Sequence, residues 1–504
     1  MLHNEKLAGG GGRGLPLVKS FDRMVRRTSN GTMSAEVMYE EYAKSLGLPT
    51  REGLQKALAT NAITGYGDAT PLRLENLDST MTEVLVRAEH LKLFRMLPRV
   101  PSIQEHFQWM RHTDYGSHRG SPGFRQGGAP SGGVSTWARG NTDVRWMGVL
   151  RGYTHQLQVT GQMGGTFIDP IMAENNGGTR QLLEIIERWL VWGQSAILDK
   201  DGNTVNYDGI YQQLLTARPK SIIDKAGDPM TFEDMEKIGF LLNTDGKLAN
   251  FNDVYSLWHS KVLSDLGILK LQAERIILGS PNMPTGFVPG VPLNGYNTQF
   301  GEIPFDFSIL LDQVEQGAPL VVTQTNAPVR PASVTATPGA GTTTIPAGTL
   351  YYFVSSMGDA GESDTVAATG AAVTAGQQVV IAPARVAAAT AYRIYRSDGV
   401  NDVTKAKWIA TVTQDTLGVG AGSNYTDTNQ IMPGTYVGIV MNVTTEDIVI
   451  AQMLPLIKYP LARITTTEPF LLLLYHVLAI KAPERVLFIK NIGNRIPLAD
   501  WRNI

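Results

Sequence analysis

Residues 179–198 read TRQLLEIIERWLVWGQSAIL, and they decide the fold class because they form the clearest helical pattern in the sequence. The apolar residues recur three and four positions apart and give the helix one broad apolar face. They are Leu182, Leu183, Ile185, Ile186, Trp189, Leu190 and Ile197. Thr179 is a suitable N-cap, and Asp201-Gly202 is a suitable stop. We therefore expect one long helix that buries a wide face.

Mixed helix and strand patterns follow this helix. Two further helices are expected at 231–242 and 252–266, because each stretch begins with a polar cap and ends near a glycine. After Gly434, apolar stretches predict strands at 436–443, 447–453 and 486–489. The expected fold class of this part of the chain is α+β.

Between 325 and 433 the composition changes to Thr, Ala, Val and Gly, and helical periodicity disappears. Short candidate strands alternate with turns, and they lie at 349–355, 377–381, 391–396 and 408–412. Short strands at spacings of roughly 8 to 12 residues indicate a β-sandwich. We therefore expect an all-β sandwich inserted into the larger α+β domain.

Residues 101–168 are rich in glycine and tend to alternate between 149 and 159, which predicts a long hairpin. No lysine occurs between Lys92 and Lys200, so arginines supply the positive charge. The arginines are Arg111, Arg119, Arg125, Arg139, Arg145 and Arg151. Because guanidinium groups form bidentate pairs with carboxylates, such a hairpin is suited to lie across a neighbouring subunit. A solvated surface loop is the alternative interpretation.

The composition excludes several classes of protein. The chain has 504 residues, of which 43% are hydrophobic and 18% charged, so it is globular rather than disordered. Its formal net charge of -2 favours no strong attraction to nucleic acid. The absence of cysteine excludes disulfides and thiolate metal sites. The first 14 residues do not resemble an export signal, and the longest apolar run, 469–480, is shorter than a membrane span, so we expect synthesis in the cytoplasm and no membrane contact.

No catalytic pattern stands out. The sequence has no phosphate-binding Walker loop, no HExxH and no GxSxG. Asp199, Asp201 and Asn203 resemble a calcium loop only in part, since the glycine is misplaced, and they are expected to form a turn. The four histidines of the hairpin lie on no common helical turn, and we expect them to be solvated or interfacial; they are His106, His112, His118 and His155. We expect no catalytic residue, no metal and no cofactor, and hence a structural protein.

The order of these elements resembles the major capsid proteins of tailed double-stranded DNA bacteriophages, which share the Hong Kong 97 fold. On that resemblance the chain divides into five parts. They are an N-terminal arm and helical region (1–100), an E-loop hairpin (101–168), a peripheral (P) domain spine helix with an axial (A) domain (169–324), the inserted sandwich (325–433) and a return through both domains (434–504).

The inserted segment is similar to immunoglobulin-like and fibronectin type III modules. The similarity rests on four short stretches in the strand order of those modules, 351–355, 361–363, 392–396 and 424–427. On phage capsids such modules project outward, where host surfaces and glycans are within reach. The sandwich has no cysteine, so the disulfide of antibody domains is absent.

The resemblance implies a homo-oligomer of pentamers and hexamers that forms an icosahedral shell in the virion. The arginine hairpin would lie over an adjacent subunit and meet acidic residues of its spine helix such as Glu184 or Glu187. Scaffold, portal and decoration proteins are further partners, and packaged DNA would be contacted without sequence specificity. Because the hairpin has no lysine, it cannot form the lysine–asparagine isopeptide bonds that some members use.

Two other classes remain open from the sequence. A phage tail or adhesion protein with an immunoglobulin-like surface-binding module is the first alternative. The long helix at 179–198 argues against it, because tail tubes consist mainly of strands. An enzyme with a carbohydrate-binding sandwich is the second, and it would need a pair of carboxylates at a sugar cleft.

Overall fold

A computed structural model describes most of the chain from His90 onwards. The described residues are 90–116, 123–129, 133–157, 159, 170–274, 293–311, 319–359, 361–413, 424–463 and 465–495. They all belong to the second of two compact units, Val84–Ile504, and the first unit is Met1–Glu83. The expected N-terminal arm therefore lies outside the described residues, apart from 90–100.

The predicted long helix is confirmed as α6 (Pro170–Trp192), but both of its ends were misplaced. Thr179 lies inside the helix and does not cap it. The helix continues through Gly178. Glycine at this position allows close packing against a strand, because a Cβ there would come within 2.7 Å of Leu472 Cδ1. The helix ends before Gly193, whose N–H still donates to the carbonyl of Trp189 at 2.8 Å.

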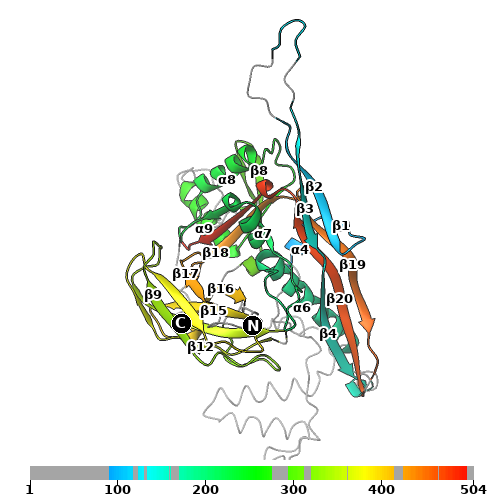
Figure 1. Ribbon diagram of the computed structural model, residues 1–504, viewed down its shortest axis with the longest axis vertical. Helices are drawn as coiled ribbons and strands as arrows, with labels where there is room; N and C mark the ends of the chain where they lie inside the picture. The colour runs from blue at the N-terminus through cyan, green and yellow to red at the C-terminus, as the bar shows by residue number, and fades with distance from the viewer. Residues whose placement is uncertain are drawn as a thin grey trace, which may run out of the picture. The chain divides into compact units, whose positions relative to one another are not determined.

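One face of α6 packs against a four-stranded sheet in the order β1-β19-β20-β4 (Figure 1). These strands are β1 (Arg99–Pro101), β4 (Arg145–Thr154), β19 (Ile448–Pro460) and β20 (Thr467–Ile480). β1 runs parallel to β19, and the other pairs are antiparallel. The alternation expected at 149–159 belongs in part to β4, which pairs with β20 rather than within the hairpin.

A six-stranded mixed sheet forms the second layer, in the order β5-β21-β18-β6-β8-β7. Its strands are β5 (Ile222–Asp224), β6 (Val254–Trp258), β7 (Gly295–Thr298), β8 (Gly301–Phe307), β18 (Tyr436–Asn442) and β21 (Val486–Ile492). Every residue of β18 and β21 is buried, because one face of the sheet packs towards α6 and the other towards α8. The predicted strands at 436–443, 447–453 and 486–489 are confirmed.

The helices that accompany this sheet are α7 (Ile210–Ala217), α8 (Phe232–Thr244) and α9 (Ser260–Glu274). Helix α8 confirms the prediction for 231–242, and Thr231 caps it in a reciprocal capping box with Asp234. The prediction of a helix at 252–266 is wrong for the first half of that stretch. That half is β6, whose aromatic and β-branched residues suit a strand with neighbours on both sides, and helix begins only at Ser260.

Residues 334–427 form two further sheets that share one apolar core, so a β-sandwich is present. The strands are β9 (Val334–Gly339), β10 (Gly348–Gly358), β11 (Gly361–Glu362), β12 (Val366–Ala367), β13 (Ala371–Val373), β14 (Gln378–Pro383), β15 (Ala391–Asp398), β16 (Lys407–Thr413) and β17 (Tyr425–Asp427). One sheet has the order β17-β14-β9, and the other centres on β10, β15 and β16. The four strands predicted in this segment are confirmed as β10, β14, β15 and β16.

The remaining described elements are short. They are α4 (Leu93–Met96), the ribbon strands β2 (His106–Asp114) and β3 (Thr136–Asp143), and the 3-10 helices η4 (Pro219–Ser221), η5 (Ile309–Leu311), η6 (Val403–Lys405) and η7 (Pro483–Arg485). No described helix is both long enough and apolar enough to cross a membrane.

Candidate subunit interface

The expected hairpin contains a two-stranded ribbon. β2 pairs antiparallel with β3, and within the described residues neither strand joins another sheet. The ribbon carries large exposed side chains: Met110 is 71% exposed and Trp137 is 60% exposed. His112 stacks on Trp137 with ring centroids 4.2 Å apart. A loop that is only solvated would not need to expose apolar and aromatic side chains of this size.

Three of the predicted interface arginines pair within their own chain. Arg111 forms an ion pair with Glu484. Arg145 Nη2 lies 3.0 Å from Asp143 Oδ2. Arg151 reaches helix α6, where Nη2 donates to Gln181 Oε1 at 2.5 Å and Nη1 lies 3.5 Å from Glu174. Arg111 and Arg151 therefore attach the hairpin to the rest of the chain, whereas the Arg145 pair lies within the hairpin.

Two other predicted arginines are different. Arg125 and Arg139 are exposed, and the described part of the chain offers them no ion pair. Arg139 lies on β3 opposite Met110 of β2. Arg119 lies outside the described residues. Arg125 and Arg139 are therefore the described arginines that remain available to a neighbouring copy.

The two predicted acidic partners also differ from each other. Glu184 pairs with Arg188 on the same helix, with Arg188 Nη2 donating to Glu184 Oε1 at 2.9 Å. Glu187 is only 2% exposed, and its carboxylate accepts the backbone N–H groups of Leu93 and Phe94 at 2.6 and 2.9 Å. Burial raises the pKa of Glu187. The expectation that Glu187 meets a neighbouring subunit is wrong, because it caps α4 inside its own chain.

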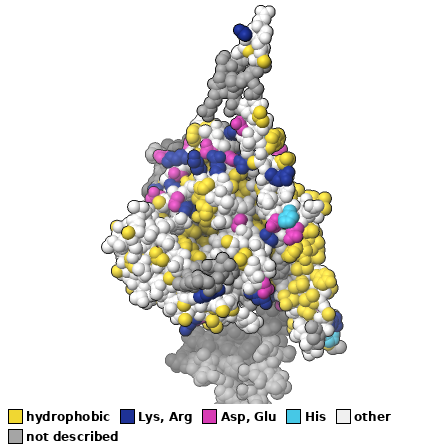
Figure 2. Space-filling view, viewed as in Figure 1, with side chains coloured by type: hydrophobic (Ala, Val, Ile, Leu, Met, Phe, Trp, Pro, Cys, Tyr) yellow, Lys and Arg dark blue, Asp and Glu magenta, His cyan; other side chains and the backbone are white. Residues whose placement is uncertain are grey.

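The described chain also exposes an apolar sheet face that the sequence analysis missed. On β4, Trp146 is 65% exposed and Leu150 is 62% exposed, on the face opposite the residues that pack on α6. They lie beside Tyr475 and Leu471 of β20, and Tyr459 of β19 is 55% exposed. Figure 2 shows hydrophobic side chains gathered over this edge of the molecule. The alternation of β4 contained this signal, since its second face is as apolar as its first.

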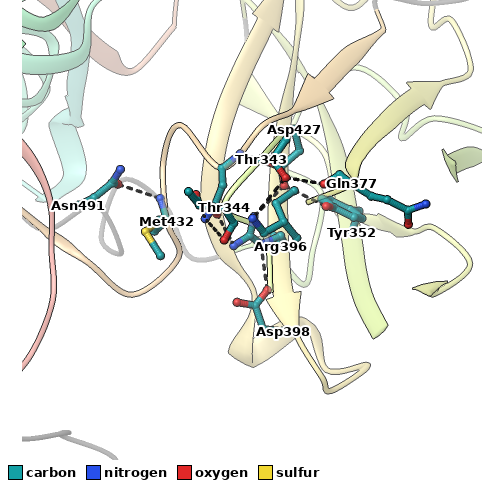
Figure 3. Close-up of polar contacts among 11 residues, drawn as sticks. Thr343, Thr344, Tyr352, Gln377, Arg396, Asp398, Asp427, Met432 and Asn491 are labelled. Carbon is teal, nitrogen blue, oxygen red and sulfur yellow. Dashed lines mark hydrogen bonds and ion pairs between the residues drawn. The ribbon is translucent and has the colours of Figure 1, made fainter. Parts of the chain in front are cut away.

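The sandwich encloses a polar cluster around Arg396, whose side chain is 1% exposed (Figure 3). Its Nη1 donates to Asp427 Oδ2 at 2.8 Å, and its Nε donates to Asp398 Oδ1 at 2.9 Å. Its Nη2 donates to Asn429 Oδ1, and Tyr352 donates its hydroxyl to Asp427 Oδ2, both at 2.9 Å. Arg396, Asp398 and Asp427 all have partners within the chain, so the cluster is a structural centre and not an open site.

The sandwich contacts the rest of the described chain at several points, among them the following two. Trp408 of β16 packs edge-on against Trp192 of α6, with ring centroids 5.4 Å apart. Beyond the sandwich, Met432 donates its backbone N–H to Asn491 Oδ1 of β21 at 2.9 Å. A small cavity of about 170 Å³ lies beside the tryptophan contact, and Arg188 and Arg393 also line it.

The aspartates and histidines that were candidates for metal binding make contacts within the fold. Asp199 Oδ1 accepts the backbone N–H groups of Asp201 and Asn203 at 2.9 and 2.7 Å, which confirms the predicted turn. His106 pairs with Asp143 at 2.6 Å. His118 lies outside the described residues, and among the described residues no group of three His, Asp or Glu side chains is arranged to hold a metal.

The chain was compared with known proteins and solved structures. No family model matches the chain. The chain is similar to the major capsid proteins of Staphylococcus phage S25-3 and Staphylococcus phage K, each at 24% identity over 462 and 465 residues respectively, covering 85% of this chain and 93% of each relative. The chain is thus similar to phage major capsid proteins along most of its length.

Solved capsid structures are also similar to the chain. The capsid of a native GTA particle has a TM-score of 0.42 at 8% identity, covering 86% of this chain and 98% of that chain. The capsid of cyanophage P-SCSP1u has a TM-score of 0.40 at 9% identity, covering 84% and 94%. In the chain, the hairpin, long helix, mixed sheet, inserted sandwich and return occur in the order that the Hong Kong 97 resemblance implies.

Proposed function

We propose that the chain is the structural protein of an icosahedral phage head, in which copies assemble as pentamers and hexamers around double-stranded DNA. One observation carries this proposal, the similarity to phage major capsid proteins along 85% of this chain and 93% of each relative. Its role is structural, and its place is the capsid of the virion.

Contacts between copies would come from the ribbon of one copy lying across the next. Arg125 and Arg139 are exposed without an ion pair among the described residues, and on the ribbon Trp137 and Met110, which lies opposite Arg139, expose large side chains. An exposed ion pair contributes only about 0–1 kcal/mol, whereas buried apolar area contributes roughly 25 cal/mol per Å². The exposed aromatic side chains would therefore supply most of the free energy of association, and the arginines would supply orientation.

The surface that receives the ribbon would be the apolar sheet face around Trp146, Leu150 and Tyr459. An exposed apolar face of this kind marks an interaction site in a soluble protein. The spine-helix carboxylates are less suitable partners, because Glu184 already pairs with Arg188 and Glu187 is buried. Repetition of such weak contacts by symmetry yields a strong shell.

The sandwich would be an immunoglobulin-like or fibronectin type III-like module that projects outward and contacts host surfaces or glycans. Support comes from its two packed antiparallel sheets and the single apolar core between them. We propose that this module spans 325–433 and that the hairpin spans 101–168. Scaffold, portal and decoration proteins would be further partners, and a formal net charge of -2 suits a wall that encloses DNA without binding it tightly.

Electron microscopy and gel filtration of the purified full chain test this function, with the chain expressed alone and with its neighbouring genes. We expect closed shells, or rings of five and six copies. A stable monomer under both conditions would contradict the proposal.

A further inference from the structure

A groove of about 850 Å³ runs beside β2, between the ribbon and the six-stranded sheet with its connections. A volume of this size lies in the range of ligand sites, roughly 300–1,000 Å³. The lining of the groove comes from 109–113 of the ribbon with Tyr115, from Arg218 at the end of α7, from 245–247 after α8, and from 445–447, 481–482 and 484–485 of the return.

The part of β2 that borders this groove is its edge. Five consecutive residues of the strand, 109–113, line the groove, and no residue of β3 does. Since neighbouring side chains of a strand point to opposite faces, five in succession can line one groove only along the strand edge. Among the described strands β2 pairs only with β3, so this edge has no pairing strand. An unpaired edge is a template for another strand.

The opposite wall of the groove is held by ion pairs within the chain. Arg218 Nη2 lies 2.8 Å from Asp245 Oδ2, and Arg485 Nη1 lies 2.8 Å from Asp447 Oδ1. Arg111 spans the groove to pair with Glu484. These contacts fix the separation of the ribbon from the wall, so the groove is pre-formed.

Lys481 of the wall has no ion pair in the described chain. Lys481 Nζ donates to the carbonyl of Thr445 at 2.8 Å, and no carboxylate lies within ion-pair distance of it. Burial lowers the pKa of Lys481, as expected for an ammonium that has lost part of its hydration. An incoming carboxylate would complete this site.

We propose that the open edge of β2 pairs with an extended segment of a second copy of this chain, and that a carboxylate of that segment binds Lys481. The segment needs about five residues, because the bordering stretch 109–113 spans about 17 Å at the rise of a strand. Strand addition of this kind derives its affinity from main-chain hydrogen bonds and its specificity from side-chain pockets.

A second copy is the occupant that the proposed function favours, and the inference rests on that function. In a shell of identical copies every β2 edge lies in equivalent surroundings, so one kind of segment can cover all of them. An edge left open on every copy would instead promote irregular association. The two lysines of the groove, Lys247 and Lys481, face only one acid outside the ion pairs named above, Glu446, which suits an acidic segment.

Cross-linking in assembled particles tests the inference. Because the chain has no cysteine, an introduced cysteine is the only thiol that a maleimide can label. Met110→Cys places a single thiol at the groove, where a benzophenone maleimide is attached before assembly and activated by light afterwards. We expect an adduct of twice the chain mass, and we expect mass spectrometry to identify an acidic extended segment from the second copy. Val400→Cys, at a 43% exposed position of the sandwich, is the matched control.

A second pair of variants tests the lysine. Lys481→Met should lower the yield of the double-mass adduct by roughly two- to fivefold, as expected for one partly exposed ion pair, and Lys481→Arg should retain it. Particles in which Met110→Cys reacts only within one copy, or only with a different protein, overturn strand addition and leave the shell intact. Failure of the unmodified chain to form particles overturns the proposed function and this inference together.

Discussion

The inserted sandwich and the β2–β3 ribbon are both built from strands, but the sandwich completes its polar contacts internally and the ribbon does not. In the sandwich Arg396 is 1% exposed and bound to Asp427 and Asp398. In the ribbon Arg139 is exposed and has no ion pair among the described residues. The comparison separates a region whose buried charges have partners inside the chain from a region whose exposed charges have none among the described residues.

Removing the buried guanidinium should have the largest effect on stability. Arg396→Met leaves the carboxylate of Asp427 buried without its partner, and we expect the free energy of unfolding to fall by about 3–5 kcal/mol. Urea denaturation followed by tryptophan fluorescence measures this loss. Arg330→Met, at an exposed pair with Asp364, is the control and should cost about 0–1 kcal/mol. Equal losses in the two variants would remove the contrast between the regions.

Acid should weaken the sheet that supports the ribbon. His476 of β20 is fully buried beside Tyr207, and burial lowers its pKa to about 4. Because the unfolded chain takes up this proton near pH 6.5, the contribution of His476 to stability is present above that pH and is lost as the pH falls towards 4. The loss is on the order of 3 kcal/mol.

Stability measured against pH checks this expectation. His476→Gln should flatten the curve between pH 6.5 and 4. An unchanged slope in His476→Gln would show that other groups carry the acid sensitivity.

The root of the ribbon should respond less strongly. Arg111→Ala removes the pair with Glu484 and should cost about 1 kcal/mol, since both side chains are partly exposed. Hydrogen exchange of the β2 amides should rise at the same time, because the ribbon loses its attachment. Arg125→Ala is the matched control and should leave exchange in β2 unchanged. Protection that survives in Arg111→Ala would place the attachment elsewhere.

The exposed arginines should have the smallest effect on folding. Arg125→Ala combined with Arg139→Ala should change the free energy of unfolding by less than about 0.5 kcal/mol, as surface substitutions do. Assembly should nevertheless fall, as gel filtration and electron microscopy would show. Adding Arg119→Ala should deepen the defect. Particles that form normally in the triple variant would contradict the role of the ribbon as a clasp.

Much of the fold could be predicted where one local signal was strong. The polar residue Thr231 marks the start of α8 in the sequence, and in the structure it caps that helix in a capping box with Asp234. The start of α6 could not be predicted, because Gly177 and Gly178 normally indicate a break, and the close approach of Leu472 that calls for Gly178 is a tertiary contact. β6 was missed for a related reason, since its neighbours β18 and β8 come from distant parts of the chain.

The candidate site was predictable as a region but not as a set of pairs. The lysine-free, arginine-rich composition identified the hairpin correctly as unusual. It could not separate Arg111 from Arg139, because only the folded chain brings Glu484 to the first of them. Glu187 was misassigned because a charged residue on a helix suggests exposure, whereas its partners are the backbone amides of α4.

The contact between Trp192 and Trp408 has a consequence for how the sandwich would act in a shell. A module that packs against α6 is held in one position, whereas a module on a flexible linker moves through a larger volume. Its spacing from the next module would instead be the spacing of the lattice. A ligand held weakly by one module would then be held by the array through avidity, at 10² to 10⁴ times the single affinity when its own spacing matches. A host surface would thus respond to the geometry of the whole head as well as to the chemistry of one module.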